Sequence, residues 1–294
     1  MFRILLSGLF AWAVGQIGPT FHSSPSELVV LPVTVADQHG QLVGGLSSER
    51  FVVFDNDRRQ PIVFFSSDDV PVSVALVVDD SGSMASRMGE VLAASLHFAR
   101  TSHPEDELFV IEFNDRVRDA VNGRRLSTGD AAELETTLRT LVPSGRTALY
   151  DGLMSGLDRL ESASLSRRVL ILVSDGGDNA SVASLDAVLA RARRSNVTIY
   201  TLGIFDRDDR DANQDVLQML ARDTGGERFL PGSPGRLMQA CDRIAREIRA
   251  SYTVGFAPVE TDGNFHRVRV ELTNGKAFRT RTRPGYFAAS KEAR

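Results

Sequence analysis

Three short polar segments of this 294-residue chain together carry the side chains needed to coordinate a metal ion. The first is Asp79-Asp-Ser-Gly-Ser83, the second contains Thr147, and the third contains Asp175. They supply two carboxylates and three hydroxyls, the oxygen ligands that a hard cation such as Mg²⁺ prefers. Because few of these ligands are charged, the bound ion would stay electron-poor and would accept a carboxylate from another molecule. The pattern therefore indicates a site at which a cation joins this chain to a partner.

The first and third segments each follow an apolar run that is typical of a buried strand. These runs cover residues 72–78 and 169–173. In an open parallel sheet, the loops that follow the strands share one edge, and ligands bind there. Taken singly, each segment also fits a structural role: a turn, or the N-cap of a helix. Taken together, they predict one metal site at the sheet edge.

These residues also carry a family resemblance. The Asp-x-Ser-x-Ser sequence resembles the first element of the metal-ion-dependent adhesion site of von Willebrand factor A (VWFA) domains. Residues 145–151 resemble its threonine element and residues 173–179 its aspartate element. The resemblance covers roughly residues 72–251 and implies a bound Mg²⁺, or alternatively Mn²⁺ or Ca²⁺, and a protein partner that presents an Asp or Glu. The expected ligands are Asp79, Ser81, Ser83, Thr147 and Asp175.

The flanking residues 29–65 and 252–286 further resemble a bacterial family of secreted "VWFA-related" proteins. In that family a short β segment precedes the A domain, and a β segment that ends in Arg-x-Gly-Tyr follows it. Here this sequence is Arg283-Pro-Gly-Tyr286.

Several charged residues near the three segments are candidates for the rim of the site or for orienting its ligands. Asp80 replaces the small polar residue more usual there, and either raises cation affinity or points into solvent. Asp151 follows Thr147 by one helical turn, and either orients a metal-bound water or lies on a solvated helix face. The charged run 206–213 follows an expected strand, and is either a plain loop or a determinant of partner choice. The rim candidates are Asp80, Asp151, Asp178, Arg207 and Arg210.

Between residues 72 and 251, apolar strand-like runs alternate with segments of helical periodicity. This alternation predicts a doubly wound, mostly parallel α/β sheet. No Gly-rich nucleotide-binding sequence follows any expected strand.

Both flanks have the pattern of β structure, and neither has enough strands to bury an apolar face alone. We therefore expect them to pair as a small β-sandwich-like module into which the A domain is inserted. The Asn-Gly at 274–275 predicts a hairpin between the strands on either side. We expect a signal peptide at 1–15, a loose leader at 16–27, an N-terminal β segment at 28–70, the VWFA domain at 71–251, a C-terminal β segment at 252–288 and a tail at 289–294.

Composition and the start of the chain indicate an exported protein. Arg3 precedes an apolar run at 4–14, and Ala13-Val-Gly15 fits a signal-peptidase site. No cysteine follows this run, so a lipid anchor is not expected, and the predicted location is secreted, periplasmic or cell-envelope. The net charge is −4 and charges of both signs are mixed along the chain, so the sequence does not suggest a basic face that would bind nucleic acid or an anionic membrane.

Cysteine and histidine usage suggests no further site. Cys241 is the only cysteine, so an intramolecular disulfide is impossible. The five histidines lack zinc-ligand spacing, and we interpret them as surface or core residues.

Two functions fit these observations, and a metal site that serves only stability is a third possibility. The favoured one is an exported, metal-dependent protein-binding or adhesion module. The alternative is a metal-dependent hydrolase that uses the Asp cluster to activate water. A hydrolase needs a general base beside the ion, and no His, Glu or Lys accompanies the three segments. We therefore expect no enzymatic activity.

Overall fold

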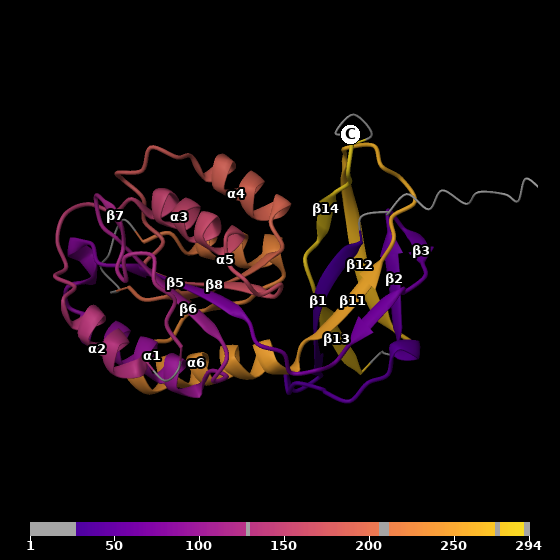
Figure 1. The fold of residues 1–294 in the computed structure, drawn as a ribbon, viewed down its shortest axis with the longest axis horizontal. Helices are drawn as coiled ribbons and strands as arrows, with labels where there is room; N and C mark the ends of the chain where they lie inside the picture. The colour runs from indigo at the N-terminus through magenta and orange to yellow at the C-terminus, as the bar shows by residue number, and fades with distance from the viewer. Residues whose placement is uncertain (1–27, 128–129, 206–211, 274–276, 291–294) are drawn as a thin grey trace, which may run out of the picture.

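The structure, a computed structural model, describes residues 28–127, 130–205, 212–273 and 277–290. Its elements form two bodies, an α/β body and an all-β module, which lie side by side (Figure 1). Within the described residues, no helix is both long enough and apolar enough to cross a membrane.

The α/β body is built on a six-stranded sheet with the order β10-β9-β8-β5-β6-β7. Every neighbouring pair is parallel except β6 and β7. All seven residues of β5 are buried, as expected for a central strand covered on both faces. The strands are β5 (Ser73–Asp79), β6 (Glu107–Phe113), β7 (Val117–Asp119), β8 (Arg168–Ser174), β9 (Val197–Gly203) and β10 (Arg228–Phe229).

Helices cover both faces of this sheet (Figure 1). Val74, Leu76 and Val78 of β5 pack in one core cluster with α1, α2 and α6, whereas Ala75 and Val77 pack with α3, α4 and α5. The arrangement confirms the predicted doubly wound, mostly parallel α/β fold. The helices are α1 (Met88–Thr101), α2 (Ala131–Arg139), α3 (Leu149–Glu161), α4 (Leu185–Arg194), α5 (Gln214–Thr224) and α6 (Pro234–Ala250).

The all-β module consists of two four-stranded sheets that share one core. The orders are β13-β1-β11-β4 and β14-β12-β2-β3, so each sheet combines strands from before and after the α/β body. Phe51 and Tyr252, one from each sheet, pack with ring centroids 4.9 Å apart. The predicted pairing of the flanks is confirmed. The strands are β1 (Val29–Asp37), β2 (Phe51–Asp55), β3 (Arg58–Gln60), β4 (Phe64–Ser66), β11 (Tyr252–Phe256), β12 (Phe265–Leu272), β13 (Phe278–Arg281) and β14 (Gly285–Phe287).

The hairpin predicted around the Asn-Gly pair is wrong. β12 pairs with β2 and β14, whereas β13 pairs with β1 in the other sheet. The two strands therefore belong to different sheets. An Asn-Gly pair favours a chain reversal, but it does not determine which sheet the following strand joins.

The Arg-x-Gly-Tyr sequence joins the module to the α/β body. The Arg283 side chain is only 5% exposed, and it donates hydrogen bonds to Asn196 Oδ1 (3.0 Å) and to the carbonyls of Arg193 (2.8 Å) and Ser195 (2.5 Å) at the end of α4. A Cβ at Gly285 would lie 2.2 Å from the carbonyl oxygen of His266, so only glycine fits beside β12. The hydroxyl of Tyr286 donates to Asp55 Oδ2 within the module core (3.1 Å).

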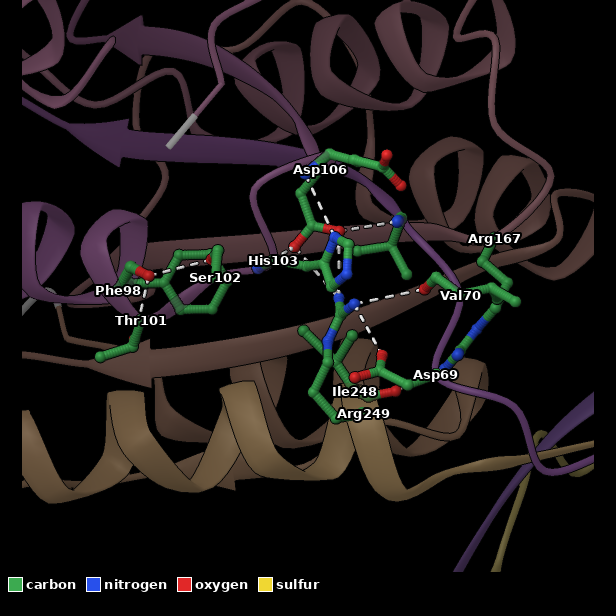
Figure 2. Close-up of polar contacts among 12 residues, drawn as sticks. Asp69, Val70, Phe98, Thr101, Ser102, His103, Asp106, Arg167, Ile248 and Arg249 are labelled. Atoms are coloured by element: carbon green, nitrogen blue, oxygen red, sulfur yellow. Dashed lines mark hydrogen bonds and ion pairs between the residues drawn. The ribbon is translucent and has the colours of Figure 1, made fainter. Parts of the chain in front are cut away.

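A second arginine fastens the end of α6 to the segment that enters the α/β body. Arg249 donates to Asp69 Oδ1 (3.0 Å) and to the carbonyl of Val70 (3.2 Å), and it pairs with both oxygens of Asp106 (Figure 2). The same Asp106 accepts from the backbone N–H of Val72 at 2.8 Å. The entry and exit of the inserted body are thus tied together through one buried carboxylate.

Replacing Arg283 with alanine should reduce the free energy of unfolding by about 3 kcal/mol, because three hydrogen bonds from a buried guanidinium are lost. Urea denaturation measures this. The matched control is Arg279→Ala, an exposed arginine of β13, which should change stability by less than about 0.5 kcal/mol. Equal stability of the two variants would contradict the anchoring role of Arg283.

Candidate functional site

The expected ligands come from three loops at the carboxyl ends of β5 and β8. Asp79 is the last residue of β5, and Asp175 directly follows β8. The two strands are parallel neighbours, with Val78 opposite Val173, so their ends lie at the same edge. Thr147 lies two residues before the start of α3. Asp79, Ser81, Thr147 and Asp175 are buried, whereas Ser83 is exposed.

Hydrogen bonds connect four of these residues. Ser83 Oγ donates to Asp175 Oδ2 at 2.7 Å, and the hydroxyls of Ser81 and Ser83 lie 3.1 Å apart. The backbone N–H of Ser81 donates to Asp79 Oδ1 at 3.0 Å. The structure thus gathers carboxylate and hydroxyl oxygens from two separate segments in one region.

The Thr147 segment is attached to both of the others by its backbone. The N–H of Gly82 donates to the carbonyl of Gly145 at 3.2 Å. On the other side, Thr147 N–H donates to Asn179 Oδ1 at 2.9 Å, and the Thr147 carbonyl accepts from Asn179 N–H at 2.9 Å. These bonds place Thr147 between the first and third segments.

The loop after β8 has a conformation that only glycine permits. Gly176 has φ +85°, and a Cβ there would lie 2.4 Å from the carbonyl oxygen of Asn213. The tight turn lets Gly177 N–H donate to Asp175 Oδ1 at 2.8 Å. The Asp175 carboxylate is therefore held by its own loop as well as by Ser83.

The electrostatics of Asp79 fit a cation ligand. Burial raises the pKa of Asp79 to about 7, and repulsion from Asp175 adds to this effect. Hydrogen bonds from Ser174 Oγ (2.6 Å) and from Ser81 act in the opposite direction. A buried carboxylate whose ionised form is costly is stabilised by a nearby cation. The donor set, two carboxylates and three hydroxyls, suits a hard divalent ion.

Asp80 does not point into solvent. Its side chain is fully buried and turned toward β6 and β7, where Oδ2 accepts from Asn114 Nδ2 (3.3 Å) and from Arg118 Nη2 (3.2 Å). Burial, followed by repulsion from Glu112, raises the pKa of Asp80 to about 6. The alternative that Asp80 points into solvent is wrong, because Asp80 directly follows a buried strand and its side chain stays buried at the edge of the sheet.

Asp151 and Asp178 both form hydrogen bonds that hold the loop after β8 against the start of α3. The Asp151 carboxylate accepts from the N–H groups of Val182 (2.9 Å) and Ala183 (2.8 Å). Asp178 Oδ1 accepts from Ser181 Oγ (2.5 Å) and from Tyr150 N–H (3.3 Å). Neither side chain lies free on a solvated helix face. Arg207 and Arg210 lie outside the described residues.

Sequence reasoning missed Ser174 and Asn179, which position Asp79 and Thr147 by the hydrogen bonds described above. The available signal was their place beside Asp175, inside the third segment. It also missed a cluster around His266 in the all-β module, since the buried contact of His266 with Asp55 joins residues that are far apart in the chain.

Curated proteins related in sequence include inter-alpha-trypsin inhibitor heavy chains. Inter-alpha-trypsin inhibitor heavy chain H3 from Pongo abelii is 25% identical over 206 residues, and the Homo sapiens protein is 24% identical over 206 residues. Each match covers 62% of this chain and 23% of the relative. The chain thus spans less than a quarter of the length of the curated relatives it matches.

Solved structures show the same fold at low sequence identity. A von Willebrand factor type A protein from Catenulispora acidiphila has a TM-score of 0.54 and 15% identity, covering 91% of this chain and 76% of that one. The vWF domain of the type V pili tip protein Mfa5 from Porphyromonas gingivalis has a TM-score of 0.51 and 18% identity, covering 61% and 95%. The pilus adhesin SpaC from Lactobacillus rhamnosus GG has a TM-score of 0.50 and 13% identity, covering 87% and 48%.

The family model of the von Willebrand factor type A domain matches residues 73–234, which are more than half of the chain. These residues run from β5 to the start of α6 and include all three segments of the candidate metal site. The match shows that this protein belongs to the von Willebrand factor type A domain family.

Proposed function

We propose that this protein is an exported binding module in which a divalent cation bridges to an Asp or Glu carboxylate of a partner protein. Mg²⁺ is the expected ion, with Mn²⁺ or Ca²⁺ as alternatives. The observation that carries the proposal is the hydrogen-bonded gathering of Ser81, Ser83 and Asp175 beside Asp79 at the carboxyl end of the sheet. The proposed ligands are Asp79, Ser81, Ser83, Thr147 and Asp175.

The burial pattern supports a site that is closed on the protein side and open to a partner. The carboxylates of Asp79 and Asp175 lie beneath the surface, whereas Gly82 and Ser83 are exposed. Arg146, next to Thr147, is also exposed and would attract an acidic partner. A cation held here would present its remaining coordination positions outward.

The structural neighbours support binding rather than catalysis, because they include a pili tip protein and a pilus adhesin. We propose a corresponding location for this chain, secreted, periplasmic or in the cell envelope, with residues 1–15 as the signal peptide. We also propose the division into a leader, two β segments and a VWFA domain at 71–251.

Mg²⁺ should bind the full chain at one site, and Asp79→Asn or Thr147→Ala should weaken this binding at least about tenfold, because each removes or weakens a ligand. Isothermal titration calorimetry measures the affinity. Asp186→Asn, an exposed carboxylate on α4, is the matched control and should bind as the wild type does. Superimposable titrations of wild type and Asp79→Asn would refute the site.

The affinity for Mg²⁺ should rise about tenfold per pH unit up to about pH 7 and then level off. The pKa of Asp79 is raised to about 7, and the metal needs the ionised carboxylate, so protons compete below that pH. Titrations at pH 6, 7 and 8 test this.

In EDTA, the free energy of unfolding should change with pH in the opposite direction to the Mg²⁺ affinity. Between about pH 4 and pH 7 the folded protein binds the Asp79 proton that the unfolded chain releases, so the free energy of unfolding should fall as pH rises. Asp79→Asn should flatten this dependence. A flat Mg²⁺ affinity from pH 6 to pH 8 would contradict the assignment of Asp79 as a ligand.

Immobilised wild-type protein should capture a partner from envelope and secreted fractions in Mg²⁺ and release it in EDTA. Asp175→Asn should capture none, because the cation is lost, whereas Arg146→Ala should slow association without abolishing it. Mass spectrometry of the eluates identifies what is captured. Recovery of the same proteins on wild type and on Asp175→Asn would mean that the bridging mechanism is wrong.

A further inference from the structure

Three side chains that could bind a metal meet in the all-β module, outside the site described above. Glu260 and Asp262 lie in the loop between β11 and β12, and His266 is the second residue of β12. Their ligand atoms lie within 4.8 Å of one another, and the described residues contain no other such group of three His, Cys, Asp or Glu side chains. We call these three residues the module cluster.

The imidazole of His266 is held in a fixed orientation by the buried carboxylate of Asp55. Its side chain is 2% exposed, and Nδ1 lies 3.0 Å from Oδ1 of Asp55, a buried residue of β2. Asp55 Oδ2 in turn accepts from the hydroxyl of Tyr286 at 3.1 Å. An ionised carboxylate only accepts hydrogen bonds, so Nδ1 carries the N–H. Metal-binding histidines are oriented in this way, by a carboxylate that accepts from the nitrogen remote from the metal.

The other ring nitrogen then faces a second acceptor. Nε2 lies 3.1 Å from Asp262 Oδ1, and in a neutral imidazole that donates from Nδ1 it has a lone pair and no proton. Two lone pairs at this distance require a positive species between them, either a second ring proton or a metal ion. A proton would serve only the contact between His266 and Asp262. A metal ion could in addition bind the nearby carboxylate of Glu260, which in the structure pairs with Arg58.

We propose that Glu260, Asp262 and His266 form a second metal site, which binds Zn²⁺. Imidazole with carboxylates suits zinc, whereas Mg²⁺ and Ca²⁺ prefer oxygen ligands alone. In tetrahedral zinc coordination, ligand atoms about 2.1 Å from the ion lie about 3.4 Å apart. The ligand atoms of the module cluster lie within 4.8 Å of one another, so the exposed carboxylates would move inward by up to about 1.4 Å when the ion binds. The ion would join the loop at 257–264 to β12 and, through Asp55, to β2.

Arg58 gives the proposal an internal test. Its Nη1 pairs with Glu260 Oε1 at 2.7 Å, and both side chains are largely exposed. The guanidinium competes with a metal for this carboxylate. Removing the guanidinium should therefore strengthen zinc binding, an effect that a purely structural role of Arg58 would not produce.

The experiment uses the full chain with Asp175→Asn, which disables the proposed Mg²⁺ site. Zn²⁺ titrated into this protein should bind at one site and raise the unfolding temperature, and Co²⁺ should give visible d–d absorption. Adding Glu260→Gln and Asp262→Asn should weaken zinc binding at least about tenfold, while Arg58→Gln should tighten it. Glu271→Gln, an exposed carboxylate of β12, is the matched control.

The Gln and Asn replacements are at exposed positions, so their unfolding temperatures in EDTA should match that of the parent. This shows that a loss of binding is not a loss of fold. Unchanged zinc affinity after both replacements, or no zinc binding by the parent, overturns the proposal. In that case His266 is a doubly protonated imidazole between Asp55 and Asp262.

Discussion

β5 and β8 lie side by side in parallel, with Val78 opposite Val173, and this register brings Asp79 and Asp175 to the same edge of the sheet. The two carboxylates are 96 positions apart in the chain, and only the pairing of buried strands joins them. A shift by one residue would turn every side chain of β5 to the opposite face and place apolar residues against the wrong helices. The apolar core on both faces of the sheet thus fixes the geometry of the polar site at its edge.

The same core buries two carboxylates at the site, and burial makes their ionised forms energetically costly. Asp79 and Asp80 are both fully buried, but their surroundings differ. Asp80 has the guanidinium of Arg118 beside it, whereas the described neighbours of Asp79 are hydroxyls, a backbone N–H and the carboxylate of Asp175. A divalent cation beside Asp79 would offset the cost of its burial. Asp79 and Asp80 therefore have different roles because their carboxylates point toward different neighbours.

The all-β module depends on both flanks, because each of its sheets combines strands from before and after the α/β body. Two arginines connect the module to the α/β body. Arg281 pairs with Glu247 on α6, and Arg283 reaches the end of α4. The last helix of the A domain is therefore attached to the module at its carboxyl end. Any change in the position of α6 would disturb the ion pair between Arg281 and Glu247.

Periodicity and motif spacing were enough to predict the α/β fold, the pairing of the flanks and the elements from which the expected ligands come. They could not predict contacts made by residues in separate elements. The environment of Asp80 depends on Arg118 of β7, and the orientation of His266 depends on Asp55, which is 211 positions away. The Asn-Gly signal failed for a related reason, since a local turn preference does not determine which sheet the next strand joins.

The central claim is that a divalent cation occupies the sheet edge between Asp79 and Asp175. Anomalous diffraction from crystals grown with Mn²⁺ tests it most directly. We expect an anomalous peak within coordination distance of Asp79, Ser81, Ser83, Thr147 or Asp175, with at least one coordination position open to a water or a partner carboxylate. Anomalous peaks elsewhere on the chain, with none at this edge, would contradict it.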